Sequence, residues 1–268
     1  MMPQATTTVR RMIIELFGPP GAGKTTFAQA LTNRLRRNGH TVELVLSHRP
    51  VEGRRQRQSD RDSASDGWFA PAAERLSRPL LEVLALARHP RALSHEIGAV
   101  ADLFRALPPR NKIWGARFAQ YVLRLMHSWT RASAARHIVL FDQAFVQIIG
   151  TLVQFGRAAD EAVIARALDC SPRPDLLIRL DAPPETLAIR LNERTRRQSA
   201  LERLFEVDLA VNLDSIRIID HLHALLRDRG EFVITGSSLD DRSLCQSIER
   251  IERELTGMFS AERRPVAS

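Results

Sequence analysis

One short stretch of the chain, residues 18–25, has residue types and spacing suited to binding phosphate groups. It fits the pattern G-x-x-x-x-G-K-[ST] at every fixed position. Glycines let such a loop turn tightly and bring backbone N–H groups close to phosphate oxygens. Lys24 then places a cation on the β- and γ-phosphates of a nucleotide, and Thr25 offers a hydroxyl to Mg²⁺. The predicted nucleotide-binding residues here are Gly18, Pro19, Pro20, Gly21, Ala22, Gly23, Lys24, Thr25 and Thr26.

The flanking segments match the structural context that this loop requires. Residues 12–17 form an apolar run typical of a buried strand, and apolar residues recur at helical spacing over 24–37. The order of strand, loop and helix favours a phosphate site over a glycine-rich turn that merely precedes a helix, and the helix adds its positive N-terminal end. Of the 39 basic residues only Lys24 and Lys112 are lysines, so the loop keeps the compact point charge that fits between phosphates.

Asp142 is a candidate for a second group in the same site. It follows four apolar residues, Ile138 to Phe141, which predict another buried strand. A carboxylate at the end of a strand beside the phosphate loop can hold Mg²⁺ directly or through water. We therefore expect Thr25 and Asp142 to be the metal-binding residues, although many buried strands end in Asp for structural reasons.

Two arginines, Arg190 and Arg194, are candidates for catalysis because they are four residues apart on one side of a predicted helix. Phosphoryl transfer spreads negative charge over the transferred group, and arginines can neutralise it. The alternative is a solvated basic helix end that interacts with the helix dipole. Together with Lys24 and Asp142, these arginines complete the predicted catalytic set.

The alternation of strand and helix patterns predicts an α/β fold of the P-loop NTPase type, with a five-stranded parallel sheet flanked by helices. The strands are expected at residues 12–17, 41–46, 137–141, 174–180 and 231–235. Such a sheet brings the phosphate loop and Asp142 to the same edge.

Helical stripes fill most of residues 71–135, which indicates a helical insertion of about 48–135 after the second strand. We expect this insertion to pack over the carboxyl ends of the strands. Residues 1–11 are expected to be a disordered lead, 12–259 a single domain and 260–268 a loose tail.

Composition sets further bounds on the function. The net charge of +8 and the pI near 10.8 favour anionic partners. Small phosphate-bearing ligands are anionic partners of this kind, and the sequence contains no nucleic-acid-binding motif. Two isolated cysteines, Cys170 and Cys245, do not make a disulfide framework. The first residues lack the apolar core of a signal peptide, and no run approaches the ~20 apolar residues of a membrane span. We therefore expect a soluble, cytoplasmic protein with no membrane partner.

Three segments resemble those of a known family. Residues 17–26 read FGPPGAGKTT, residues 176–197 read LLIRLDAPPETLAIRLNERTRR, and residues 232–241 read FVITGSSLDD. These are similar to P-loop kinases of the nucleoside monophosphate kinase group, and most of all to thymidylate kinases. The resemblance covers about 12–47 and 137–258 in outline, and only the phosphate loop is highly specific.

This resemblance implies ATP-dependent phosphoryl transfer with Mg²⁺. It also implies that Arg190 and Arg194 lie beside a mobile lid near residues 194–203, and that Gly236 lies near the base of the bound nucleotide. Two departures bear on the acceptor. Thymidylate kinases carry Asp-Arg after the third strand, where this chain has Asp142 and Gln143. They carry Arg-Glu-Pro after the second strand, where this chain has His-Arg-Pro, and the catalytic Glu that deoxynucleoside kinases place nearby is missing.

The acceptor is expected to be a small anionic molecule, of phosphorylated or nucleotide-like character. Arg49, Arg54, Arg55 and Arg57 follow the second strand, and guanidinium groups bind phosphate oxygens in pairs. A neutral hydroxyl acceptor would need a positioned base, and Asp142 is the candidate for that role. The alternative is that the arginine-rich loop is solvated and contacts nothing. The sequence leaves a homodimer open.

Two other function classes compete with a phosphotransferase. One is an ATPase or nucleotide-dependent switch that acts on a protein partner, and the other is a nucleotide-binding protein without catalysis. The guanine motif Asn-Lys-x-Asp is incomplete here, because Asn111 and Lys112 are followed by Ile113 and Trp114. Phosphate gain by an added metabolite would distinguish the kinase from both.

Overall fold

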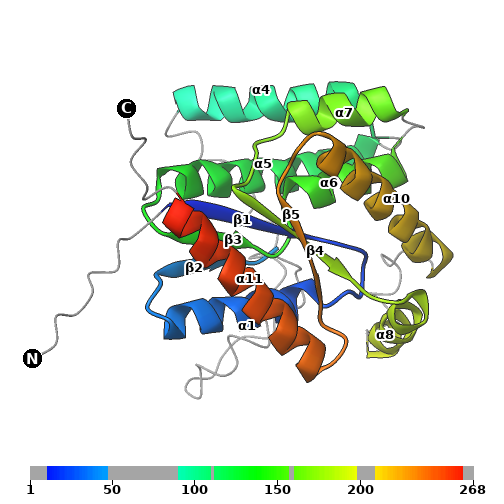
Figure 1. Ribbon diagram of the computed structural model, residues 1–268. Helices are drawn as coiled ribbons and strands as arrows, with labels where there is room; N and C mark the ends of the chain where they lie inside the picture. The colour runs from blue at the N-terminus through cyan, green and yellow to red at the C-terminus, as the bar shows by residue number, and fades with distance from the viewer. Residues whose placement is uncertain (1–10, 48–89, 110–111, 157–159, 198–208, 262–268) are drawn as a thin grey trace, which may run out of the picture.

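The computed structural model describes residues 11–47, 90–109, 112–156, 160–197 and 209–261. The strands are β1 (Met12–Phe17), β2 (Val42–Val45), β3 (Ile138–Phe141), β4 (Leu176–Asp181) and β5 (Val233–Ser237). The helices are α1 (Lys24–Arg37), α4 (Pro90–Ala106), α5 (Lys112–Ala134), α6 (Phe145–Phe155), α7 (Glu161–Asp169), α8 (Pro184–Arg197), α10 (Leu209–Asp228) and α11 (Asp241–Ala261). Figure 1 shows one twisted sheet with helices on both faces.

The strand β1 is the centre of the sheet. The order is β2-β3-β1-β4-β5, and each neighbouring pair is parallel. All six residues of β1 are buried, because strands flank it on both sides and helices cover both faces. The predicted five-stranded parallel sheet is therefore confirmed, with strand ends slightly displaced from those expected. The carboxyl ends of β1, β3 and β4 meet at one edge, from which the phosphate loop leaves.

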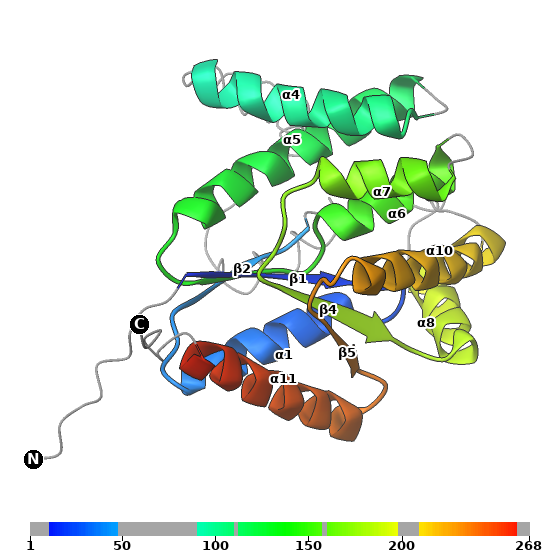
Figure 2. The ribbon, with the colours of Figure 1, turned by 45° about the horizontal axis from the view of Figure 1, so that its top comes forward.

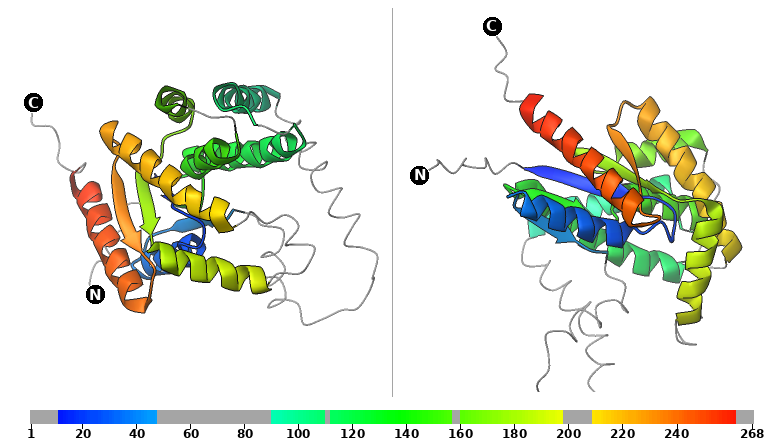
Figure 3. Two further views of the ribbon diagram at one scale, coloured as in Figure 1. Left: turned by 90° about the vertical axis from the view of Figure 1, so that its right-hand side faces the viewer. Right: turned by 60° about the horizontal axis from the view of Figure 1, so that its bottom comes forward.

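Two hydrophobic clusters fill the spaces on either side of the sheet. On one face, α1 and α11 lie side by side and pack against Ile14, Leu16 and Ile178 (Figure 3). On the other face, α5, α6 and α10 pack against Ile13, Val139 and other residues of the alternate strand positions. Figure 2 shows α4 as the outermost helix, above α5. None of the described helices combines the length and apolarity needed to span a membrane.

The predicted insertion is partly described, and α4 and α5 confirm its helical character. Trp129 of α5 stacks on Phe141 with ring centroids 5.1 Å apart and meets Phe145 edge-on at 5.2 Å. The second half of α5 therefore lies on one face of the sheet, beside Phe141 at the carboxyl end of β3. That the insertion as a whole packs over the carboxyl ends of the strands stays a prediction. Residues 48–89, with the arginine-rich loop and the first predicted helix, lie outside the described residues.

Replacement of Trp129 by Ala tests this packing. Trp129 is only 6% exposed, so the change should lower the free energy of unfolding by about 3–5 kcal/mol through lost contacts and a cavity. Urea denaturation measures the effect. The control is Ile97→Ala on α4, where the side chain is 48% exposed and a change within about 0.5 kcal/mol is expected. Equal losses in the two variants would contradict the packing of α5 on the sheet.

Candidate functional site

The phosphate loop connects the end of β1 to the start of α1. Gly23 is the N-cap residue of α1 and has a left-handed conformation, with φ 84° and ψ 22°. A side chain there would also overlap the Ser238 hydroxyl, so both backbone conformation and space require glycine. The first turn of α1 has no side-chain cap and no acidic residue. This end of the helix is therefore suited to an anionic ligand.

Lys24 curls back over the loop that precedes it. Its Nζ donates hydrogen bonds to the carbonyl oxygens of Gly18, at 2.8 Å, and Pro19, at 3.0 Å. The side chain is only 7% exposed, so its charge is held within the loop rather than in bulk water. Lys24 thus lies where the motif predicts a phosphate-binding cation.

Asp142 joins three segments of the site. Its Oδ2 accepts a hydrogen bond from Thr25 Oγ1 at 2.8 Å, and its Oδ1 accepts one from the backbone N–H of Ser47 at 2.6 Å. Thr25 belongs to α1, and Ser47 follows β2. The two residues predicted to bind Mg²⁺ therefore lie in direct contact, although 117 positions separate them in the chain.

The contact between Thr25 and Asp142 fits a magnesium site of the kind found in nucleotide-binding proteins. A hydroxyl and a carboxylate are hard oxygen ligands, and Mg²⁺ is usually held by one or two carboxylates together with substrate phosphates and water. Within the described ranges, no group of three or more His, Cys, Asp or Glu side chains is arranged to hold a metal alone. The metal would therefore need oxygen ligands from the nucleotide.

Arg190 lies against the outer side of the phosphate loop. Its guanidinium donates to the carbonyl oxygens of Gly21 at 3.2 Å, Ser238 at 2.8 Å and Leu239 at 3.0 Å. Arg190 therefore fastens the loop to the connection between β5 and α11. Arg194 is on the same helix, α8, but its side chain is not among those described. A role for either arginine in phosphoryl transfer stays a prediction.

The connection after β5 also supports the loop. Ser238 Oγ donates to the carbonyl oxygen of Ala22 at 2.9 Å, a contact that sequence reasoning missed. Gly236 is buried in β5, where an added Cβ would come within 3.3 Å of Leu180 Cδ2. A contact of Gly236 with the nucleotide base stays a prediction.

Two polar residues near the phosphate loop were not predicted from the sequence, because each stands in a run of apolar residues. Gln147, in the first turn of α6, accepts a hydrogen bond at its Oε1 from the backbone N–H of Gly18 at 3.3 Å. Glu15 lies inside β1 and is completely buried, and its Oε1 accepts a hydrogen bond from the backbone N–H of Val146 at 2.7 Å. Glu15 stands in an otherwise apolar six-residue run, and that anomaly is the sequence signal that could have identified it.

The surroundings of Glu15 change its ionisation. Burial raises the pKa of Glu15 from 4.5 to about 8, although hydrogen bonds from the backbone N–H groups of Val146 and its neighbours act to lower it. Its other oxygen, Oε2, is buried and has no hydrogen-bond partner among the described residues. Glu15 is therefore neutral in the folded protein between pH 4.5 and about 8, where the same group in the unfolded chain is charged.

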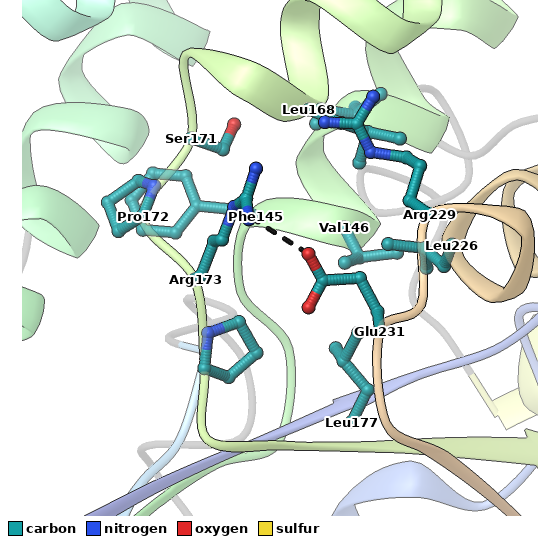
Figure 4. Close-up of a pocket in the computed structure, with 12 residues that line it drawn as sticks. Phe145, Val146, Leu168, Ser171, Pro172, Arg173, Leu177, Leu226, Arg229 and Glu231 are labelled. Atoms are coloured by element: carbon teal, nitrogen blue, oxygen red, sulfur yellow. Dashed lines mark ion pairs between the residues drawn. The ribbon is translucent and has the colours of Figure 1, made fainter.

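A small pocket lies behind the first turn of α6, between α6, α7 and α10. Figure 4 shows Phe145, Val146 and Leu177 in its wall. Arg173 and Glu231 form an ion pair at its rim, with 3.6 Å between Nε and Oε1. The pocket is lined from the amino-terminal ends of β4 and β5, so it lies away from the phosphate loop.

Sequence comparison finds relatives that match most of the chain. It is 30% identical to a thymidylate kinase of Xanthomonas campestris pv. campestris, strain B100, over 215 residues, which are 78% of this chain and 75% of that protein. The thymidylate kinase of strain 8004 matches equally well. A solved structure of deoxyadenosine kinase from M. mycoides, with dCMP and dCDP bound, aligns with a TM-score of 0.47 at 14% identity, covering 92% of this chain and 100% of that one. No protein-family model matches the chain.

The raised pKa of Glu15 predicts a pH dependence of stability. Between pH 4.5 and about 8 the folded protein keeps a proton on Glu15 that the unfolded chain has lost. Glu15 should therefore make the free energy of unfolding fall as the pH rises, by up to about 1.4 kcal/mol per pH unit. In Glu15→Gln this contribution is absent, and denaturation of both proteins between pH 5 and 8 measures the difference. Identical pH slopes would mean that Glu15 is ionised in the folded protein.

Proposed function

The chain belongs to the thymidylate kinase family, and we propose that it transfers the γ-phosphate of ATP to a small anionic acceptor, with a nucleoside monophosphate such as thymidylate as the first candidate. The family relationship rests on 30% identity over 78% of the chain. The protein is accordingly a kinase, a phosphotransferase that acts on a nucleotide-like acceptor. ATP as donor, Mg²⁺ as cofactor and the roles of individual residues are parts of the proposal.

The contact between Thr25 and Asp142 is the observation that carries this proposal. It brings the hydroxyl of the phosphate-loop helix to 2.8 Å from a carboxylate at the end of the neighbouring strand, beside the buried Lys24. A glycine-rich turn with no ligand has no need for this combination of cation, hydroxyl and carboxylate. The combination suits a triphosphate with its metal ion.

Each group has a distinct part in the proposed reaction. The loop N–H groups and Lys24 bind and orient the phosphates of the donor. Thr25 and Asp142 would hold Mg²⁺, which neutralises charge on the phosphates when it is bound. An oxygen of the acceptor forms a bond to the γ-phosphorus as the bond from that phosphorus to the β–γ bridging oxygen breaks, and ADP leaves. Arg190 and Arg194 are proposed to oppose the charge that develops on the transferred group.

The acceptor is proposed to be anionic. An ionised phosphate oxygen can attack without a base to remove a proton, which agrees with the missing glutamate near the end of β2. Arg49, Arg54, Arg55 and Arg57 are proposed to bind the acceptor, but they lie outside the described residues. Gln143 stands where thymidylate kinases have the Arg of Asp-Arg. The missing Arg is a reason to include nucleoside monophosphates other than thymidylate among the candidate acceptors.

The test is an acceptor screen with the purified full chain. ATP labelled in its γ-phosphate is incubated with Mg²⁺ and a panel of nucleoside monophosphates, with uncharged nucleosides for comparison. Mass spectrometry should find the label on a monophosphate, with ADP formed in equal amount. Lys24→Ala should lower the rate by about 10²–10³-fold, by analogy with the loss of other groups that stabilise developing charge. Hydrolysis that needs no acceptor would favour the nucleotide-dependent switch and contradict the proposal.

Asp142→Asn tests the metal assignment separately. The amide keeps an acceptor for the Ser47 N–H but loses the negative charge. The Mg²⁺ concentration that gives half-maximal rate should rise by about tenfold or more, while ATP still binds.

Asp181→Asn is the matched control for that change, because Asp181 ends β4, on the other side of β1 from β3. Its described side-chain contacts are with the Ala182 N–H and with Arg179, and none is with Thr25. Its Mg²⁺ profile should match that of the unmodified protein. An unchanged profile in Asp142→Asn would show that Asp142 is structural or faces the acceptor.

A further inference from the structure

We propose that Glu15 is a positioning residue for Asp142, holding the start of α6 so that the Asp142 carboxylate meets Thr25. This inference rests on the proposed function for the role of Asp142, but the contacts that carry it are independent of the acceptor. Glu15 is completely buried on β1, so it does not touch the nucleotide and cannot act on the reacting atoms itself.

Glu15 supplies the acceptor that the first turn of α6 lacks. The N-cap residue of α6 is Ala144, which has no side-chain hydrogen-bonding group, and no side-chain cap is formed. Helices expose unpaired N–H groups in their first turn, and these groups are costly to bury without acceptors. The Oε1 of Glu15 accepts from Val146 N at 2.7 Å. A carboxyl group from the central strand thus takes the place of a local cap.

The same residue holds both ends of the segment that carries Asp142. Glu15 is paired in the sheet with Phe141, the residue immediately before Asp142. Its side chain holds Val146, shortly after Asp142. Residues 142–144 are the whole connection between β3 and α6, so a shift at the start of α6 would be passed directly to Asp142.

Asp142 has little room for such a shift. Its carboxylate reaches Thr25 Oγ1 at 2.8 Å and Ser47 N at 2.6 Å at the same time. The first turn of α6 also carries Gln147, which accepts from Gly18 N in the phosphate loop. Loss of the Glu15 contact would therefore loosen two connections to the nucleotide site, one on each side of Lys24.

Several side chains around this contact are apolar, although Ser171 and Glu231 also line the adjoining pocket, and among the described residues no side chain caps the N-cap position of α6. Phe145 and Val146 face the pocket of Figure 4, and Leu177, the partner of Glu15 on β4, lies in its wall. Phe145 also packs edge-on against Trp129. The hydrogen bond that Glu15 accepts from Val146 N therefore ties the start of α6 directly to β1.

The experiment compares three replacements of Glu15. Glu15→Gln keeps the acceptor oxygen and the length of the side chain. Glu15→Leu keeps the bulk but removes the acceptor, and Glu15→Asp keeps the carboxyl group but shortens its reach by one methylene. Calorimetry with a non-hydrolysable ATP analogue, with and without Mg²⁺, measures binding, and initial rates against Mg²⁺ concentration measure turnover.

Glu15→Leu should weaken Mg²⁺-dependent binding of the analogue by about tenfold or more, as for other residues that support a metal ligand, and should weaken metal-free binding much less. Glu15→Gln should stay within about twofold of the unmodified protein, because the hydrogen bond to Val146 is kept. If Glu15→Leu does not fold, Glu15→Asp provides the test. This variant should also weaken Mg²⁺-dependent binding of the analogue.

The control for a general loss of stability is Leu152→Ala. Leu152 is a fully buried residue of the same helix, away from its first turn. This variant should be less stable but should keep the Mg²⁺ dependence of the unmodified protein. The proposal is overturned if Leu152→Ala changes that dependence as much as Glu15→Leu, if Glu15→Gln fails to restore it, or if neither Glu15→Leu nor Glu15→Asp changes it. Absence of phosphate transfer by the unmodified protein would reject the proposed function and leave this binding test intact.

Discussion

The hydrogen bond between Thr25 and Asp142 is the contact on which the organisation of the site depends. It can form only because β1 and β3 are adjacent parallel strands whose carboxyl ends reach the same edge of the sheet. The phosphate loop returns from the end of β1 to begin α1, and that return brings Thr25 over the end of β3. Other contacts hold the loop in the conformation that this hydrogen bond requires. Lys24 is buried against the loop, and Ser238 donates a hydrogen bond to the carbonyl oxygen of Ala22.

Fixing Asp142 in this position requires buried polar groups inside an apolar core. Asp142 is 1% exposed and Glu15 is fully buried, and a carboxyl group in such surroundings is costly unless it is hydrogen-bonded or protonated. Asp142 accepts hydrogen bonds from Thr25 and Ser47. Glu15 accepts one from the start of α6, and its raised pKa keeps it neutral, while its Oε2 has no partner among the described residues. On the α5 side, Trp129 covers these buried groups by stacking on Phe141 and by its edge-on contact with Phe145.

The sequence predicts those parts of the molecule that local patterns determine. Short motifs and apolar periodicity predict the phosphate loop and the order of strands and helices along the chain. They also predict that Thr25 and Asp142 lie close together. The face that α5 covers could not be predicted, because a helical stripe identifies the buried side of a helix but not the surface it packs on. Glu15, Gln147 and Ser238 were missed because their partners are distant in the chain. The hydrogen bonds of Arg190 to backbone carbonyls beside the loop were not predicted either, and its catalytic role stays a prediction.

We propose that Thr25 and Asp142 together form the metal site of this kinase. The most direct measurement is a crystal structure of the full chain with a non-hydrolysable ATP analogue and Mn²⁺ in place of Mg²⁺, in which anomalous scattering locates the metal. We expect an anomalous peak beside Thr25 Oγ1, with the Asp142 carboxylate bound to the metal directly or through one water. A metal ion bound to the phosphates but in contact with neither residue, or a nucleotide bound away from the loop, would contradict it.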